Sequence, residues 1–132
     1  MVLVDTNVLV DVFERDPQWW RWSLGQLQSL SAKHQLAINL VIYAELAATH
    51  TSSALLDGKI ATMNLALEDI PRAAAFLAGK AFVLYRRRGG KKTGVLADFF
   101  IGAHAATLGA LLLTRDPGKY STYFPAVHLV AP

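Results

Sequence analysis

The sequence predicts an α/β fold in one domain, with a parallel, doubly wound sheet of about five strands flanked by helices. Short runs such as MVLVD and ALLLTRD are apolar at consecutive positions, which is typical of strands buried on both faces. These runs alternate with longer helix-like segments, and that alternation favours a parallel sheet with helices on both sides. The 132 residues suffice for one hydrophobic core and not for two.

The N-terminal half is expected to begin with a strand at residues 1–5 and a short helix at 6–15. A second helix is predicted to start near Pro17, because proline favours the first position of a helix. Its broad apolar face would combine Trp19, Trp20, Leu24, Leu27 and Leu30, which places the first two tryptophans in the core. Trp22 lies off that face, where it would help to form a groove for a partner helix. A strand at 35–40 and a helix at 41–50 follow.

The C-terminal half continues the alternation with a strand at 63–69 and an Ala-rich helix at 71–88 that Gly89 and Gly90 end. The next helix, in TGVLADFFIGAHAATLG, is expected to have Thr93 as its N-cap and Gly109 as its C-cap. Strands at 110–116 and 126–130 complete the predicted sheet.

Composition excludes several classes of protein. The chain has no Cys, so disulfides and thiolate zinc sites are excluded. Asp5 and Asp11 interrupt the first apolar stretch, and no basic segment precedes it, so we do not expect a signal peptide. No apolar run approaches the length of a membrane span, so no membrane partner is expected.

Positive charge is concentrated in one segment, which contains Arg86, Arg87, Arg88, Lys91 and Lys92 and no acid. Without these five residues the chain has 8 basic against 10 acidic side chains, so the rest is mildly acidic. Such a cluster suits a polyanion such as RNA or an acidic peptide tail. A solvated helix end is the simpler explanation for any one of these residues.

Four acids are expected at one edge of the sheet. Asp5 ends the first strand and Asp116 follows the fourth, whereas Glu45 and Asp98 lie early in two helices. Carboxyl ends of parallel strands form the ligand-binding edge of such sheets, so these side chains should meet there. Each acid alone has an ordinary structural explanation, as a helix cap, a turn residue or a surface charge; the coincidence of all four favours a site.

Four neighbouring carboxylates repel one another unless a cation neutralises them. Oxygen ligands without Cys or a His pair select Mg²⁺, for which Mn²⁺ can substitute, over zinc. Carboxylate-held Mg²⁺ is a common apparatus for phosphodiester cleavage by an activated water. Thr6 and Thr114 flank the acids and would hydrogen-bond a carboxylate or a metal-bound water. Arg115 would contact a phosphate or form a structural ion pair.

Over essentially its whole length, residues 1–132, the chain resembles a PIN domain of the VapC type. The stretches that carry the resemblance are LVDTNVLVD, YAEL, RRRGGKKTGVLADFFIGAHA and LLLTRD, in this order. No acidic position departs from the family pattern, although Ala97 stands where relatives often have Pro.

The resemblance implies a metal-dependent endoribonuclease toxin with Asp5, Glu45, Asp98 and Asp116 as its catalytic and metal-binding acids. It also implies a homodimer, a cytoplasmic setting, and inhibition by a cognate VapB-type antitoxin, through which alone the protein would reach operator DNA. A PIN-fold module that binds RNA or antitoxin without cleaving is the alternative, although the intact set of acids argues against it. A receiver-type phosphoacceptor domain is disfavoured, because adjacent acids after the first strand and a Lys ending a late strand are both missing.

Overall fold

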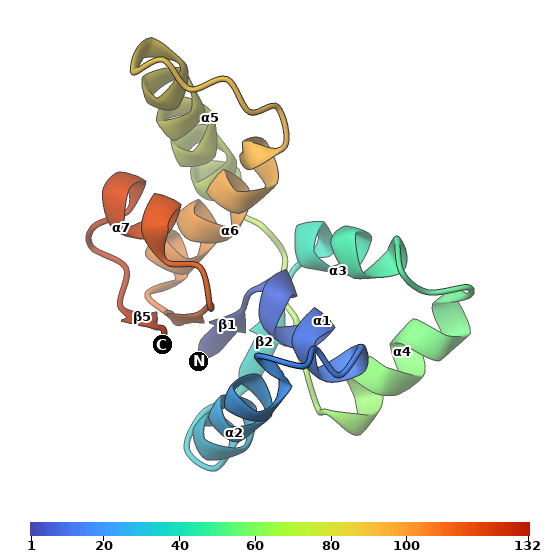
Figure 1. Cartoon of the computed structure of the whole chain (residues 1–132). Helices are drawn as coiled ribbons and strands as arrows, with labels where there is room; N and C mark the ends of the chain where they lie inside the picture. Colours follow the sequence, from blue (N-terminus) through green and yellow to red (C-terminus); the bar gives the residue numbers. More distant parts are fainter.

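The protein folds around a five-stranded, fully parallel sheet with strand order β3-β2-β1-β4-β5 (Figure 1). The computed structural model describes all residues, 1–132. The predicted α/β fold with a parallel sheet of about five strands is therefore confirmed. The strands are β1 (Val2–Val4), β2 (Leu36–Ile38), β3 (Ala66–Leu67), β4 (Leu111–Leu113) and β5 (Leu129–Val130).

Seven helices connect the strands, two each in the first three connections and one in the last. They are α1 (Thr6–Phe13), α2 (Trp20–Ser31), α3 (Leu40–Ala47), α4 (Ser53–Thr62), α5 (Arg72–Arg87), α6 (Val95–Leu108) and α7 (Gly118–Tyr123). Figure 1 shows α5 extending away from the sheet, with the loop after it leading back to the start of α6. None of the helices combines the length and the apolar character that a membrane span requires.

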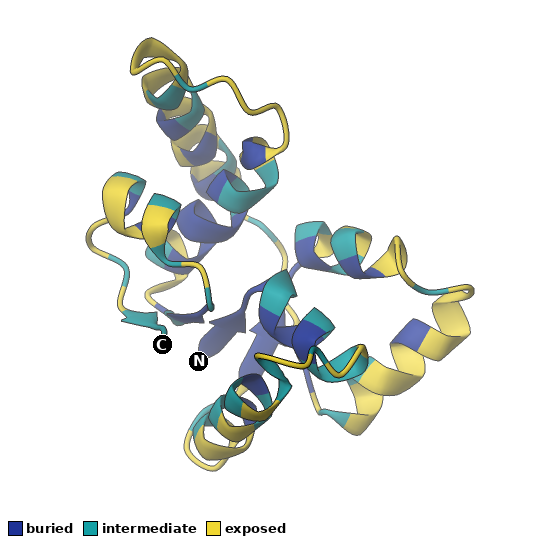
Figure 2. Ribbon diagram, viewed as in Figure 1, coloured by how far each residue is buried: buried dark blue, intermediate teal, exposed yellow.

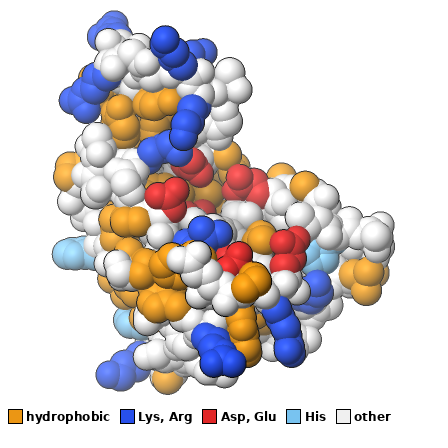
Figure 3. Space-filling model, viewed as in Figure 1, with side chains coloured by type: hydrophobic (Ala, Val, Ile, Leu, Met, Phe, Trp, Pro, Cys, Tyr) orange, Lys and Arg blue, Asp and Glu red, His pale blue; other side chains and the backbone are white.

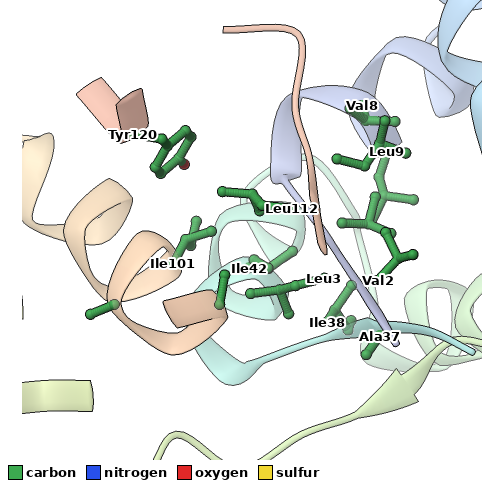
Figure 4. Close-up of a cluster of buried hydrophobic side chains, with 14 of the residues drawn as sticks. Val2, Leu3, Val8, Leu9, Ala37, Ile38, Ile42, Ile101, Leu112 and Tyr120 are labelled. Carbon is green, nitrogen blue, oxygen red and sulfur yellow. The ribbon is translucent and has the colours of Figure 1, made fainter. Parts of the chain in front are cut away.

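The core lies on both faces of the three central strands. All residues of β1 and β2 are buried, as the dark blue of these strands in Figure 2 shows. Leu3 and Leu112 are fully buried and lie close to Ile42 of α3 and Ile101 of α6 (Figure 4). Full burial of each such side chain contributes about 1.5–3 kcal/mol, which explains why the strands are apolar at consecutive positions.

Glycines end two helices as the sequence indicates. Gly89 follows α5 with φ +86°, and Gly109 caps α6 with φ +65°, both in the left-handed region that favours glycine. The expectation that Thr93 is the N-cap of α6 is wrong, because Gly94 occupies that position and no side chain caps the helix. Thr93 is exposed in the loop before the helix.

The second helix starts at Trp20 and not near Pro17, because Asp16 first forms a turn. Its carboxylate Oδ1 accepts hydrogen bonds from the backbone N–H groups of Gln18 and Trp19, both at 2.9 Å. Within the helix Ser23 and Leu27 are buried and Leu30 packs against the core, so the predicted face is confirmed at the two leucines.

The placement of the tryptophans is corrected accordingly. Trp22 packs against the core, whereas Trp19 and Trp20 are only half-buried and lie outside the core cluster. Arginine side chains cover the two outer rings: Arg115 lies over Trp19, and Arg15 and Arg21 lie over Trp20.

Two helices were not anticipated from the sequence. Helix α4 begins after Ser52, whose hydroxyl accepts from the backbone N–H of Leu55, and α7 begins after Pro117. Helix α7 contains six residues only, yet its Tyr120 is 2% exposed and reaches the ends of the central strands. This short helix therefore takes part in the site described next.

Candidate acidic active site

The site lies where the order of the strands reverses. Strands β2 and β3 continue the sheet on one side of β1, and β4 and β5 continue it on the other. Val4 pairs with Leu113, so the next residues, Asp5 and Thr114, stand side by side at the carboxyl ends of β1 and β4. Ligands of open α/β sheets bind in the crevice at this switch point.

Asp5 is the most buried acid of the site, with 4% of its surface exposed. Its Oδ1 accepts from the backbone N–H of Thr6 at 2.8 Å, so Asp5 is also the N-cap of α1. Its Oδ2 accepts from the hydroxyls of Thr114 at 2.8 Å and Tyr120 at 2.9 Å, and from the side-chain amide of Asn7 at 3.3 Å. Both oxygens are thus held in place by donors.

Burial raises the pKa of Asp5 from its ordinary value of 3.8 to about 6. The hydrogen bonds from Thr114, Tyr120 and the Thr6 backbone counteract this rise in part, whereas the negative charge of Asp98 adds to it. The ionised form of Asp5 is therefore less favourable in the folded protein than in water, as long as only protein groups surround the carboxyl.

Asp98 and Asp116 line the same small pocket as Asp5. The pocket has a volume of about 30 Å³, and its other walls are Asn7, Lys119 and Tyr120. Asp98 lies in the first turn of α6, and its Oδ2 accepts from the ammonium of Lys119 at 3.0 Å. Asp116 is exposed at the rim. Three of the four predicted acids therefore meet in one pocket, as the sequence indicates.

Glu45 approaches the pocket from α3 without lining it. The hydroxyl of Thr6 donates to Glu45 Oε1 at 2.5 Å, and Thr6 directly follows Asp5. The pKa of the Tyr120 hydroxyl is raised far above its ordinary value by burial first, and then by the charges of Asp5, Asp98 and Glu45. Glu45 thus lies close enough to contribute to the negative potential of the site.

Both threonines contact the acids as anticipated. Thr114 bonds Asp5 and accepts from the backbone N–H of Asp116 at 3.0 Å, which ties the ends of β1 and β4 together. Thr6 bonds Glu45. The catalytic and metal-binding roles of the four acids stay predictions, since these contacts concern their positions alone.

The donor chemistry of the pocket fits a hard divalent cation. Carboxylates of Asp5, Asp98 and Asp116 and the amide oxygen of Asn7 are oxygen ligands of the kind that Mg²⁺ and Mn²⁺ prefer. A cation would also offset the burial, and the smaller repulsion by Asp98, that together raise the pKa of Asp5. In the structure no three acidic or histidine side chains are already arranged as a metal-binding group, so the side chains must move to bind one.

Arg115 forms a structural ion pair, one of the two roles considered for it. Its Nε lies 2.9 Å from Oδ2 of Asp11 in α1, and Asp11 is 1% exposed. The hydroxyl of Ser23 in α2 donates to the same oxygen at 2.8 Å. The pair joins the loop after β4 to α1 and α2, and does not involve the neighbouring Asp116.

The basic cluster occupies the end of α5 and the loop that leads to Asp98. All five residues, Arg86, Arg87, Arg88, Lys91 and Lys92, are exposed. The guanidinium of Arg88 lies 5.5 Å from the ring centre of Tyr123 in α7, the helix that also carries Lys119 and Tyr120. Figure 3 shows Lys and Arg side chains gathered over the end of α5 and acidic side chains nearer the middle of this face. The cluster therefore lies on the same face of the molecule as these acidic side chains, at the end of the helix that extends away from the sheet.

A buried polar pair joins the two helices that carry Glu45 and Asp98. Asn39 caps α3 by accepting from the backbone N–H of Ile42, and its Nδ2 lies 3.0 Å from Nδ1 of His104 in α6. His104 is fully buried, and burial lowers its pKa. Its Nε2 has no hydrogen-bond partner.

Asn7, Lys119 and Tyr120 were not identified as site residues from the sequence. Asn7 follows the Asp-Thr pair of the first strand directly, and this position was the one available signal for it. Lys119 and Tyr120 lie in α7, a helix that the sequence pattern did not indicate.

Comparison with known proteins places this geometry in a family. The family model described as PIN domain matches residues 2–124. A crystal structure of VapBC2 from Rickettsia felis bound to a promoter DNA fragment aligns with a TM-score of 0.75 at 20% identity, over 100% of this chain and 99% of that chain.

DNA-bound VapBC from Salmonella typhimurium aligns with a TM-score of 0.70 at 20% identity, over 98% of this chain and 96% of that chain. A toxin-antitoxin complex from Klebsiella pneumoniae aligns with a TM-score of 0.65 at 23% identity, over 98% and 96%. These similarities show a shared fold. The search of curated proteins found no significant match.

Proposed function

The chain belongs to the PIN domain family, and from this premise we propose that it is a Mg²⁺-dependent endoribonuclease that acts as the toxin of a toxin–antitoxin pair. The observation that carries the proposal is the convergence of Asp5, Asp98 and Asp116 on one pocket at the switch point of the sheet. The likeness to the VapBC and toxin-antitoxin structures supports the biological role.

Asp5, Asp98 and Asp116 would hold Mg²⁺ or Mn²⁺, with Glu45 beside them. When bound, the ion supplies a Lewis acid that activates water and stabilises the oxygen leaving phosphorus. Thr114 and Tyr120 fix the orientation of Asp5 through its Oδ2. Thr6 fixes Glu45 through Oε1, which leaves Oε2 to accept a proton from the attacking water.

The basic cluster would hold the RNA backbone and direct it toward the pocket. Five exposed cations without an intervening acid provide a positive field on the same face as the acidic side chains. Binding through phosphates should weaken steeply with salt, because each contact releases counterions. Because Arg115 is bound to Asp11, it would contribute to RNA binding through its positive charge at a distance more than through direct contact with a phosphate.

The partners follow from the toxin role. We propose a cognate VapB-type antitoxin as the inhibitor, a homodimer as the assembly, and operator DNA reached only through the antitoxin. The structures of VapBC2 from Rickettsia felis and VapBC from Salmonella typhimurium, both described as bound to DNA, motivate the last point.

The test is cleavage of total cellular RNA by the purified, antitoxin-free protein with Mg²⁺, with Mn²⁺ and with EDTA, and the cut ends are mapped by sequencing. Asp98→Asn should abolish cleavage and leave the thermal midpoint unchanged or higher, because it removes repulsion from the pocket. Asp57→Asn is the matched control, since Asp57 is exposed on α4 and bonds only Tyr43.

Discrete, metal-dependent cuts that disappear in Asp98→Asn and persist in Asp57→Asn would support the nuclease. Folded, metal-loaded protein that leaves all RNA intact would refute it and favour the module that binds without cleaving. Retained cutting by a destabilised Asp98→Asn would refute the assignment of Asp98.

A further inference from the structure

We infer that Lys119 is a resident counter-ion of the acidic pocket, which competes with the divalent cation for Asp98 and so weakens metal binding. The inference rests on the proposed function, because it concerns the same pocket. It assigns to Lys119 the role of regulating how readily the site binds its metal ion.

The ammonium of Lys119 lies inside the group of carboxylates. Its Nζ is 3.0 Å from Oδ2 of Asp98, and both side chains line the pocket together with Asp5 and Asp116. Only two ion pairs occur in the chain, and the other joins Arg115 to Asp11. Lys119 is therefore the one basic side chain in direct contact with a pocket acid.

The contact with Asp98 makes the two cations competitors. The Lys119 ammonium occupies Oδ2 of Asp98, one of the few carboxylate oxygens that line this small pocket. Mg²⁺ keeps several waters in its coordination shell when carboxylates bind it, so it needs more room than the pocket offers beside the ammonium. An ion that takes Oδ2 of Asp98 as a ligand therefore has to displace Lys119.

The lysine side chain can leave without disturbing α7. Lys119 is 31% exposed, so a route to solvent is open. The neighbouring Tyr120 is buried and anchored to Asp5 by its hydroxyl at 2.9 Å. Tyr120 thus keeps the helix in place while the flexible chain of Lys119 changes rotamer.

Electrostatics gives the exchange its direction. Without a metal, Asp5 and Asp98 repel each other, and the ammonium neutralises part of that charge. A divalent cation neutralises more, so it displaces the lysine once its concentration is high enough. Partly exposed ion pairs of this kind shift an equilibrium by about two- to fivefold, which sets the size of the expected competition.

The test measures Mn²⁺ binding to the metal-stripped full chain at low salt and without RNA, from the electron paramagnetic resonance signal of free Mn²⁺. Lys119→Met should bind Mn²⁺ about two- to fivefold more tightly than wild type, because the competitor is gone while the aliphatic stem stays. Lys119→Arg keeps the charge and should bind like wild type. Lys80→Met is the control for net charge, since Lys80 is exposed on α5 and its ammonium lies over the ring of Phe76.

The difference between wild type and Lys119→Met should shrink at high salt, because salt screens the ion pair. Equal or weaker Mn²⁺ binding by Lys119→Met would overturn the inference and leave the metal site standing. Absence of Mn²⁺ binding in every variant would overturn the proposed metal site and the inference with it.

Discussion

Replacing Asp5 with Asn tests the most unusual ionisation in the molecule. The pKa of Asp5 is about 6 in the folded protein, mainly because the carboxyl is buried, and 3.8 is its ordinary value in an unfolded chain. Between these two values the folded state binds the proton more tightly, so stability falls as the pH rises through this window. Well below pH 3.8 both states are protonated and the penalty vanishes.

The size of the effect follows from the two pKa values. A tenfold difference in proton affinity corresponds to about 1.4 kcal/mol, so a rise from 3.8 to about 6 makes ionised Asp5 cost about 3 kcal/mol. Asp5→Asn removes that charge and keeps the shape. Its amide nitrogen then faces the hydroxyls of Thr114 and Tyr120, so we expect a net gain of roughly 1–3 kcal/mol at pH 7.5 without metal.

The assay is urea unfolding of wild type and Asp5→Asn in EDTA at several pH values between 4 and 8. The difference in unfolding free energy should be smallest at pH 4 and grow through pH 6. Buried His104 works in the opposite direction, because its lowered pKa makes both proteins lose stability as the pH falls through its unfolded value near 6.5. This contribution cancels in the difference between the two proteins.

Adding Mn²⁺ should reverse the advantage of the variant, since a bound cation favours the ionised carboxylate. Parallel stability curves, with the same difference at every pH, would refute the reasoning. The burial of Asp5 would then be compensated in the folded protein more fully than its hydrogen bonds suggest.

Two further pairs of variants test packing and charge by the same urea assay. Gly102→Ala should destabilise the protein by about 1–3 kcal/mol, because the added Cβ would lie 2.4 Å from the ring of Phe124. Gly79→Ala, whose Cβ meets nothing within 4 Å, should instead stabilise it by about 0.5–1 kcal/mol, and equal effects would contradict the packing. Arg115→Met should cost about 3 kcal/mol, because Asp11 stays buried and loses its cation. Adding Asp11→Asn should recover most of that loss, and strictly additive effects of the two changes would contradict a direct pair.

The sheet could be predicted from the sequence because its strands are buried on both faces. Such burial leaves runs of apolar residues in β1, β2 and β4, and no helix in a solvated position produces them. The ends of α5 and α6 were visible for a similar reason, since Gly89 and Gly109 adopt backbone angles that other residues avoid.

The local sequence pattern did not predict the structure at positions where a contact with a distant side chain determines it. Helix α7 has a polar sequence, and it is Tyr120, anchored to Asp5 across the sheet edge, that joins it to the core. The face of α2 was predicted correctly at Leu27 and Leu30 but not at its N-terminal end, where the Asp16 turn keeps Trp19 outside the helix. The partners Asp11–Arg115 and Asp98–Lys119 are likewise separated by many residues, and no spacing rule indicates them.

The two explanations of Asp5, as a helix cap and as a site residue, turn out not to exclude each other. Its Oδ1 caps α1 through the backbone N–H of Thr6, while Oδ2 faces the pocket and its donors. A change at Asp5 therefore alters both the stability of the protein and the chemistry of the site. If Asp5→Asn loses activity, that result by itself does not tell which of the two changes is responsible. Asp98 is 33% exposed, and the one side-chain hydrogen bond that it accepts comes from Lys119. Activity lost in Asp98→Asn without loss of stability would consequently report on the chemistry of the pocket alone, which makes Asp98 the more decisive position.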